Sequence, residues 1–251
     1  TNIYSPYEKA QQGNMYIDHV RGLYKVLDRI HAKYPKLEMM LCSGGGARCD
    51  YTALKYFGEL WPSDNTDPFE RLYIQWSMSK FFPVKAIAAH VTSWNKATSV
   101  KFCTDVASMC KLGFDIDLKT MDKADYAYTQ GAVANWRRLE DVILNGELYR
   151  LVSPYESNHA AVNYVSQDKS KGVVFAYDLH PRTHEPVRNV KLQGLDANRM
   201  YTVKEINLMP DTKSALDCDG QQYSGDFLMK VGLNILTPNT ATSHVLELTA
   251  E

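Results

Sequence analysis

Residues 37–70 read LEMMLCSGGGARCDYTALKYFGELWPSDNTDPFE, and this stretch decides how the rest of the chain is interpreted. It opens with a short apolar run, Leu37–Cys42, that suits a strand buried on both faces. A glycine loop and a short helix over Tyr51–Gly58 are expected next, followed by a brief strand over Leu60–Pro62. Asp64 comes just after that strand. Glycines and a carboxylate behind successive strands are typical of a catalytic rim, because barrel enzymes carry their active sites at the carboxyl ends of strands.

A helix-start signal follows Asp64. Asp67 stands directly before Pro68, and Glu70 lies three residues after Asp67. This pattern indicates an N-cap, a proline at the first helical position and the far arm of a capping box, so a helix is predicted from Pro68 to about Phe82. Because Asp67 has the capping role, Asp64 is left without a structural one. Its position alone leaves two interpretations open, a polar turn residue or a functional carboxylate.

Helical and strand-like segments alternate over residues 1–145. Apolar residues recur at helical spacing over Tyr7–Tyr34, and Pro35 ends that helix. Such alternation predicts a parallel α/β architecture. Since a (β/α)8 TIM barrel takes about 250 residues, this part corresponds to about half of one. The other elements expected here are strands at Ala86–His90 and Gly113–Leu118 and helices at Val100–Lys111 and Asp122–Leu144.

The pattern changes after Asn145-Gly146, where short strand-like runs are separated by turn residues. An all-β module over residues 146–251 is therefore predicted, most simply an antiparallel β-sandwich domain. Its expected strands are Leu148–Ser153, Ala160–Ser166, Gly172–Leu179, Val190–Leu192, Met200–Asn207, Phe227–Val231 and Ser243–Leu248.

Composition excludes several classes of partner. The formal net charge of -1 gives no reason to expect binding to nucleic acid or to acidic lipid. No apolar run has membrane-spanning length, and no grouping of His, Cys and Asp has metal-ligand spacing, so neither a membrane, a metal nor a cofactor is expected. Cys103 and Cys110 lie seven residues apart and are interpreted as buried free thiols on one helix face. The chain begins at Thr1 without a Met, so a processed or truncated start is expected and the compartment stays open between cytoplasm and periplasm.

Five further residues near the expected strand ends each have two open interpretations. Arg48, just past the glycines, could hold a carboxylate with both guanidinium arms or lie on the surface. His90 could line a pocket or be a hydrogen-bonded core histidine, and Trp94 could stack on a sugar or belong to a lid. Asp115 and Asp117 alternate with apolar residues, so one could face the barrel mouth and the other a helix layer.

The segment CSGGGAR, followed 22 residues after its Cys by the Asp of WPSDNTD, resembles the α-galactosidases of glycoside hydrolase family 36. Members of that family carry a CSGGGGR loop and a W-x-SD-x-T acid/base motif. The similarity continues through ERLYIQWSMSKFFP, AIAAHVTSW, KLGFDIDL and LYRLVSPYESNHAAVNYVS, and thus covers essentially the whole chain. The resemblance implies the second half of a catalytic (β/α)8 barrel at residues 1–145 and the antiparallel β-sandwich domain at residues 146–251.

The resemblance also implies a mechanism and a set of site residues. The family is retaining, and such enzymes use two carboxyl groups about 5–5.5 Å apart, one as nucleophile and one as general acid/base. Asp64 matches the acid/base position. The residues implied as substrate contacts are Cys42, Gly44, Gly45, Arg48, His90 and Trp94, with no metal and no cofactor. The implied substrates are α-galactoside oligosaccharides of the raffinose type.

The nucleophile of the family is the Asp of a Lys-Trp-Asp motif, and no such tripeptide occurs in this sequence. By family spacing it is expected a few residues before Thr1. The chain alone is therefore expected to be incomplete and inactive, with the N-terminal half of the same enzyme or a second copy as its partner. Two alternatives remain open, a catalytically inactive carbohydrate-binding fragment and a split-barrel partner, as does the choice between hydrolase and transferase.

Overall fold

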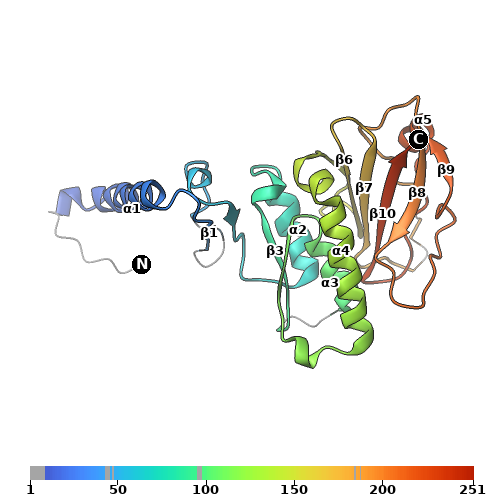
Figure 1. Ribbon diagram of the computed structural model, residues 1–251, viewed down its shortest axis with the longest axis horizontal. Coiled ribbons are helices and arrows are strands. Elements are labelled where there is room, and N and C mark those ends of the chain that lie inside the picture. Colours follow the sequence, from blue (N-terminus) through green and yellow to red (C-terminus); the bar gives the residue numbers. More distant parts are fainter. Residues whose placement is uncertain (1–8, 43–45, 47, 95–97, 184, 187) are drawn as a thin grey trace.

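The computed structural model describes residues 9–42, 46, 48–94, 98–183, 185–186 and 188–251. Figure 1 shows a helix-rich N-terminal part followed by one large antiparallel sheet. The N-terminal part contains, in order, α1 (Asn14–Lys33), β1 (Met40–Leu41), β2 (Glu59–Leu60), α2 (Pro68–Met78), β3 (Ala88–Thr92), α3 (Val100–Ala107), β4 (Lys111–Asp115) and α4 (Lys123–Asn145).

The strands of the N-terminal part are parallel. β1 pairs with β2, and β3 pairs with β4. A single parallel bridge between Leu60 of β2 and Ile87, the residue before β3, links the two pairs. The four strands therefore follow one another in sequence order, as consecutive strands of a (β/α)8 barrel do. This confirms the predicted parallel α/β architecture.

Several predicted boundaries in this part are wrong. β1 and β2 are only two residues long, and the predicted helix over Tyr51–Gly58 is reduced to a 3-10 turn at Ala53–Lys55. α2 ends at Met78 rather than near Phe82, and the N–H groups of Phe81 and Phe82 then close turns onto the Met78 carbonyl. Pro83 prevents the helix from continuing past Phe82, because a proline disfavours the helical conformation of the residue before it.

The predicted cap of α2 is confirmed. Asp67 Oδ1 accepts hydrogen bonds from the N–H groups of Phe69 (3.0 Å) and Glu70 (3.2 Å), and Pro68 is the first helical residue. The N–H of Asp67, which a capping box would pair with the Glu70 side chain, donates instead to Asn65 Oδ1 at 3.0 Å. Asn65 is thus the acceptor for the N-cap N–H, a role that the sequence pattern predicted for Glu70.

The C-terminal part is one six-stranded antiparallel sheet with the order β5-β6-β7-β10-β8-β9. Most predicted strands are confirmed, but two are wrong: Val190–Leu192 forms only an isolated bridge at Val190, and Phe227–Val231 is not a strand. Phe227–Val231 lies in and just after the helix α5, whose N-cap Ser224 accepts a hydrogen bond from Phe227 N–H. A short apolar run has no period that separates strand from helix. The elements are β5 (Glu147–Val152), β6 (His159–Val165), β7 (Lys171–Asp178), β8 (Met200–Ile206), β9 (Gln222–Ser224), α5 (Gly225–Lys230) and β10 (Thr242–Ala250).

Both faces of this sheet are covered, so successive residues of its central strands are buried alternately in two cores. On one face Val162 and Phe175 pack with residues of α3 and α4. On the other face Ala161 and Val174 pack with Leu228 of α5 and with the segments around residues 190–195 and 233–236. Those segments, joined by a single bridge between Val190 and Leu233, form the second layer of the C-terminal domain in place of another sheet.

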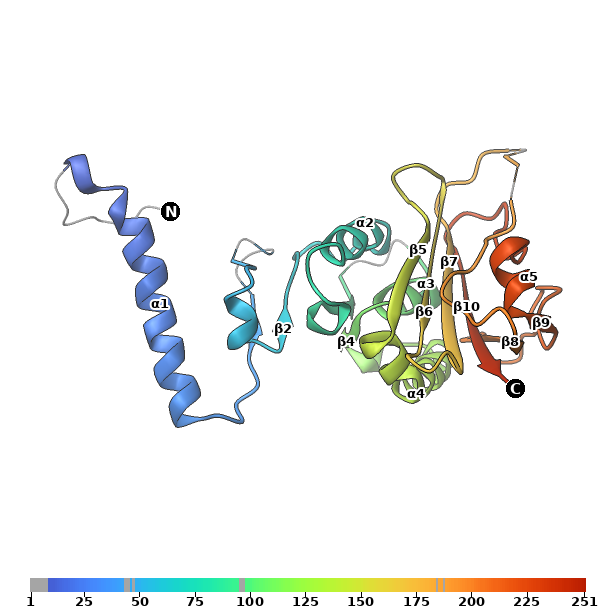
Figure 2. The same cartoon turned by 90° about the horizontal axis from the view of Figure 1, so that it is seen from above.

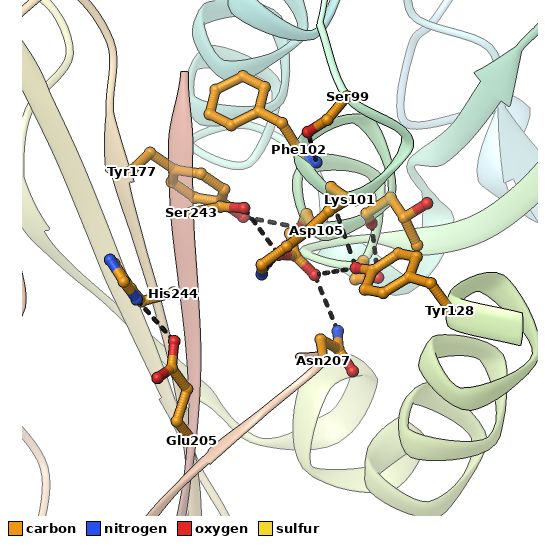
Figure 3. Close-up of polar contacts among 12 residues, drawn as sticks. Ser99, Lys101, Phe102, Asp105, Tyr128, Tyr177, Glu205, Asn207, Ser243 and His244 are labelled. Carbon is orange, nitrogen blue, oxygen red and sulfur yellow. Dashed lines mark hydrogen bonds and ion pairs between the residues drawn. The ribbon is translucent and has the colours of Figure 1, made fainter. Parts of the chain in front are cut away.

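Asp105 of α3 ties the two parts together (Figure 3). Its side chain is fully buried and accepts hydrogen bonds from four groups: Lys101 Nζ (2.6 Å), Tyr128 OH (2.9 Å), Asn207 Nδ2 (2.9 Å) and Ser243 Oγ (2.7 Å). Lys101 and Tyr128 belong to α3 and α4, whereas Ser243 lies on β10 and Asn207 directly follows β8. Burial and the adjacent carboxylate raise the pKa of Tyr128 well above its usual value, so the phenol remains a donor.

α1 extends away from the rest of the molecule in both views (Figures 1 and 2). It is held by contacts to the 3-10 turn, where Tyr24 stacks on Tyr56 with ring centroids 5.7 Å apart. Tyr16, Ile17 and Val20 on this helix are exposed. An apolar surface of this kind is expected of an open half-barrel. Within the described residues no helix is both long enough and apolar enough to cross a membrane.

The Asp105→Ala variant is expected to lower the free energy of unfolding by about 3–5 kcal/mol, because the mostly buried Lys101 ammonium loses its counter-charge. A matched control is Asp226→Ala, which removes the acidic partner of the exposed Asp226–Lys230 pair and should cost no more than about 1 kcal/mol. Urea unfolding followed by circular dichroism measures both. Equal losses in the two variants would contradict the anchoring role of Asp105.

Candidate functional site

The carboxyl ends of β1–β4 enclose a cavity of about 360 Å³. Parallel strands bring their carboxyl ends to one edge, so residues far apart in the sequence meet there. Met40 lies in β1, His90 in β3 and Asp115 at the end of β4, while the other lining residues lie just beyond a strand. The lining residues are Met40, Cys42, Trp61, Asp64, His90, Trp94 and Asp115.

Asp64 lies on the cavity with one carboxylate oxygen held. Trp61 Nε1–H donates to Asp64 Oδ1 at 2.8 Å. Asp64 is exposed, whereas Trp61 is buried among protein atoms. In the described residues no other hydrogen bond to the Asp64 carboxyl group is recorded, which leaves Oδ2 for a ligand. Trp61 was not among the predicted site residues, although it stands three positions before Asp64 in the motif that identifies Asp64.

His90 contacts the same indole. Its ring centroid lies 4.7 Å from that of Trp61. Burial lowers the pKa of His90 and the nearby Arg71 guanidinium lowers it further, whereas the carboxylates of Glu59 and Asp115 act in the opposite direction. His90 therefore remains a neutral imidazole where a free histidine begins to be protonated, and it can donate or accept a hydrogen bond at the cavity.

Gly113 of β4 leaves the room that the His90 ring occupies. The two residues are paired in the β3–β4 register. A Cβ atom at Gly113 would lie 2.4 Å from His90 Cδ2 and 2.5 Å from His90 Nε2. Any larger residue at position 113 would therefore displace the imidazole from the cavity wall.

The structure brings together four predicted site residues, Asp64, Cys42, His90 and Trp94. Trp94 is an exposed wall of the cavity, with 59% of its surface accessible to solvent. Gly44 and Gly45, predicted as sugar contacts, lie outside the described residues.

Arg48 is exposed and does not line the cavity. Gly46, two residues before Arg48, has a positive φ of 71°, and a Cβ there would lie 2.8 Å from the carbonyl oxygen of Pro62. Only a glycine at position 46 allows the backbone to approach Pro62 so closely.

All five cysteines are free thiols. Burial raises the pKa of Cys110 to about 12, so that thiol is unreactive at neutral pH, whereas Cys42 is exposed at the cavity. Among the residues that the structure describes, no group of His, Cys, Asp and Glu side chains could hold a metal ion.

Two family models match the chain. The model described as Melibiase matches residues 1–146, and the model of the glycosyl hydrolase family 36 C-terminal domain matches residues 159–248. The chain belongs to glycoside hydrolase family 36. The resemblance stated from the CSGGGAR and WPSDNTD motifs is thereby confirmed.

Curated α-galactosidases align with most of this chain. Alpha-galactosidase 2 of Hypocrea jecorina is 33% identical over 222 residues, which covers 86% of this chain and 28% of that protein. Alpha-galactosidase AgaA of Geobacillus stearothermophilus is 31% identical over 220 residues, with the same coverage of both chains. The chain thus spans less than a third of the length of these relatives.

Solved structures of the family share the fold. The α-galactosidase AgaB of Geobacillus stearothermophilus superposes with a TM-score of 0.87 at 29% identity, covering 100% of this chain and 34% of that one. An AgaA variant in complex with raffinose gives the same TM-score at 28% identity and the same coverage. The predicted fold, half of a catalytic barrel followed by the C-terminal β domain, is confirmed.

His90 is expected to make the chain less stable in acid. Its pKa is lowered in the folded state, so the unfolded chain takes up the proton first as the pH falls below about 6.5, and stability drops with it. Urea midpoints at pH 7.5 and 5.5 should therefore fall more for the wild type than for His90→Gln. His19→Gln, at an exposed position on α1, is the control and should follow the wild type. The same pH dependence in wild type and His90→Gln would contradict this expectation.

Proposed function

We propose that this chain belongs to a retaining α-galactosidase that releases terminal α-galactosyl groups from raffinose-type oligosaccharides, with Asp64 as the general acid/base. The observation that carries the proposal is the Asp64 carboxyl group, held by Trp61 at a cavity formed by the carboxyl ends of four parallel strands. Relatives named as α-galactosidases, and family structures in complex with raffinose and stachyose, support the choice of substrate.

The Trp61 contact assigns separate tasks to the two oxygens of Asp64. The indole N–H can only donate, so Oδ1 must accept and cannot carry the acidic proton along the same contact. Oδ2 then delivers the proton to the glycosidic oxygen in the first step and takes one from water in the second. The proposal thus has one oxygen oriented by the protein and one that reacts.

The second carboxylate of the retaining mechanism is assigned to residues outside 1–251. The printed sequence contains no Lys-Trp-Asp tripeptide. The exposed apolar side chains of α1 support a further segment, or another chain, that covers this side of the half-barrel. We propose the N-terminal half of the same barrel as the covering part, with residues 1–145 as barrel and residues 146–251 as the β domain.

The substrate contacts are proposed from chemistry and position. The exposed Trp94 indole suits stacking on the apolar face of a sugar, and the neutral His90 ring suits a hydroxyl group. Cys42 lines the same cavity. From the family motif, Gly44 and Gly45 are proposed to contact the galactosyl ring. Arg48, which does not line the cavity, is proposed to act indirectly by orienting a carboxylate.

A carbohydrate-binding protein without hydrolysis is the second candidate function. The observation that favours it is that, of the proposed pair of catalytic carboxyl groups, only Asp64 lies within these residues. Binding of galactose without turnover of any α-galactoside would support this candidate over the first.

Replacement of Asp64 tests the proposed acid/base role in the full-length product of the gene that encodes this chain. Asp64→Asn is expected to lower kcat/KM on raffinose about 100-fold or more, because the sugar leaving group needs its proton. The loss should be smaller on an aryl α-galactoside with a very acidic phenol, and kcat and KM should both fall there, since removal of the glycosyl group from the enzyme becomes rate-limiting. Initial rates on both substrates measure the effect.

Asp67→Ala is the matched control for Asp64→Asn. It removes a nearby carboxylate that caps α2, so it should lower the free energy of unfolding by about 1 kcal/mol. Any change in kcat/KM should be the same for raffinose and for the aryl α-galactoside. Wild-type turnover of raffinose by Asp64→Asn would remove Asp64 from the acid/base role.

A further inference from the structure

Arg71 of α2 is a buried cation whose hydrogen bonds all go to uncharged oxygens. Only 2% of its surface is exposed, and within the described residues it forms no ion pair. The guanidinium donates to the carbonyl oxygens of Ser63 (3.2 Å) and Ala88 (2.6 Å) and to Gln75 Oε1 (3.3 Å). Taking a charge out of water without a counter-ion costs several kcal/mol, so a buried guanidinium of this kind calls for a role beyond filling space.

Two of these hydrogen bonds fix the backbone on either side of the cavity. Ser63 is the residue before Asp64, and Ala88 lies in β3 two residues before His90. One turn further along α2, Gln75 Nε2 donates to the carbonyl oxygen of Val106 in α3 at 2.8 Å. The side chains of Arg71 and Gln75 thus fasten α2 to the end of β2, to β3 and to α3.

The guanidinium also lies against the indole that holds Asp64. The central carbon of Arg71 is 5.1 Å from the ring centroid of Trp61, within the range of a cation–π contact. The same ring packs against His90 and donates its N–H to Asp64 Oδ1. Arg71 therefore contacts both the side chain that donates to the carboxylate and the backbone next to it.

We propose that Arg71 is a positioning residue for Asp64, acting through the Trp61 indole and the Ser63 carbonyl. This inference rests on the proposed function of Asp64 as acid/base. Without the guanidinium, the indole loses its cation–π contact and the turn before Asp64 loses a donor. The carboxyl group then leaves the position from which it protonates the leaving oxygen.

The dependence of the rate loss on the leaving group separates a positioning role of Arg71 from a merely structural one. Misplacing an acid slows the reaction in proportion to how much the leaving group needs the proton. The leaving group of raffinose is a sugar oxygen, which is strongly basic and needs the proton most. The leaving group of an aryl α-galactoside with an acidic phenol is a weakly basic phenolate, which needs the proton little. Loss of correctly folded protein would instead lower both rates by the same factor.

The test compares raffinose with the activated aryl α-galactoside in the full-length gene product. Arg71→Met should lose about 10–100-fold in kcat/KM on raffinose and less than about tenfold on the aryl substrate. Arg71→Lys, which keeps the charge but not the fork of donors, should fall between wild type and Arg71→Met. An equal loss on the two substrates, or no loss in Arg71→Met, would overturn the inference.

Arg150 offers a matched control at the other end of α2. Its Nη2 donates to the backbone oxygen (2.5 Å) and to Oγ (2.8 Å) of Ser79, so it ties that end of the helix to β5 in a similar way. It does not line the cavity. Arg150→Met should lower both rates by the same factor, and a leaving-group dependence there would also overturn the inference.

A second variant keeps the test decisive if Arg71→Met does not fold. Trp61→Phe keeps a ring over the guanidinium but removes the N–H that binds Asp64, so it should show the same leaving-group dependence. The indole N–H signal that disappears from the ¹H–¹⁵N spectrum of Trp61→Phe identifies Trp61. That signal should shift in Arg71→Lys and stay in place in Arg150→Met. An unmoved signal in Arg71→Lys would count against the contact irrespective of turnover.

Failure of this inference and failure of the proposed function give different results. If the wild type turns over neither substrate, the proposed function is contradicted. The indole N–H signal of Trp61 then still tests the contact with Arg71. An active wild type whose Asp64→Asn variant shows the leaving-group dependence, while Arg71→Met does not, overturns only the positioning role.

Discussion

The arrangement of the two parts depends on the buried carboxylate of Asp105. Four donors surround it, two from the helices of the half-barrel and two from the C-terminal part. Apolar packing between a sheet and helices tolerates sliding, whereas a buried carboxylate is stable only when all its donors are in place. Tyr177 and Tyr164 of the sheet donate to backbone carbonyls of Asp105 and Met109, which fixes the same register. α3 is therefore held at one position on the sheet, and this also fixes the position of the strand ends next to α3.

Local signals were sufficient for most elements of the fold, but not for all of their boundaries. The alternation of strands and helices up to residue 145 follows from hydrophobic periodicity, and the start of α2 follows from Asp67 and Pro68. Asp105 could not be predicted, because Asn207 and Ser243 are 102 and 138 residues away in the sequence. The error at Phe227–Val231 has a different origin, since a short apolar run carries no information on its period.

The candidate site was predictable where a motif names a residue and unpredictable where a role depends on three-dimensional contacts. Asp64 and Cys42 belong to the motifs, and both line the cavity. The role of Trp61 depends on a turn that brings its indole back to Asp64, and the role of Gly113 depends on the β3–β4 register. Arg71 reads as an ordinary charged residue of an amphipathic helix, and only the folded structure reveals that its charge is buried.

The isolated position of α1 implies that local stability is unevenly distributed along the chain. α3 and α4 lie on a sheet that is covered on both faces, whereas in α1 only Leu27 is buried. Segments with few buried contacts open first, and their amide hydrogens exchange fastest. Opening is therefore expected to begin at α1 and to spread through β1 toward β2. Asp64 lies at the border between the part that opens first and the part that stays closed, so a segment or chain that covered α1 would also govern how long the proposed acid/base residue stays in place.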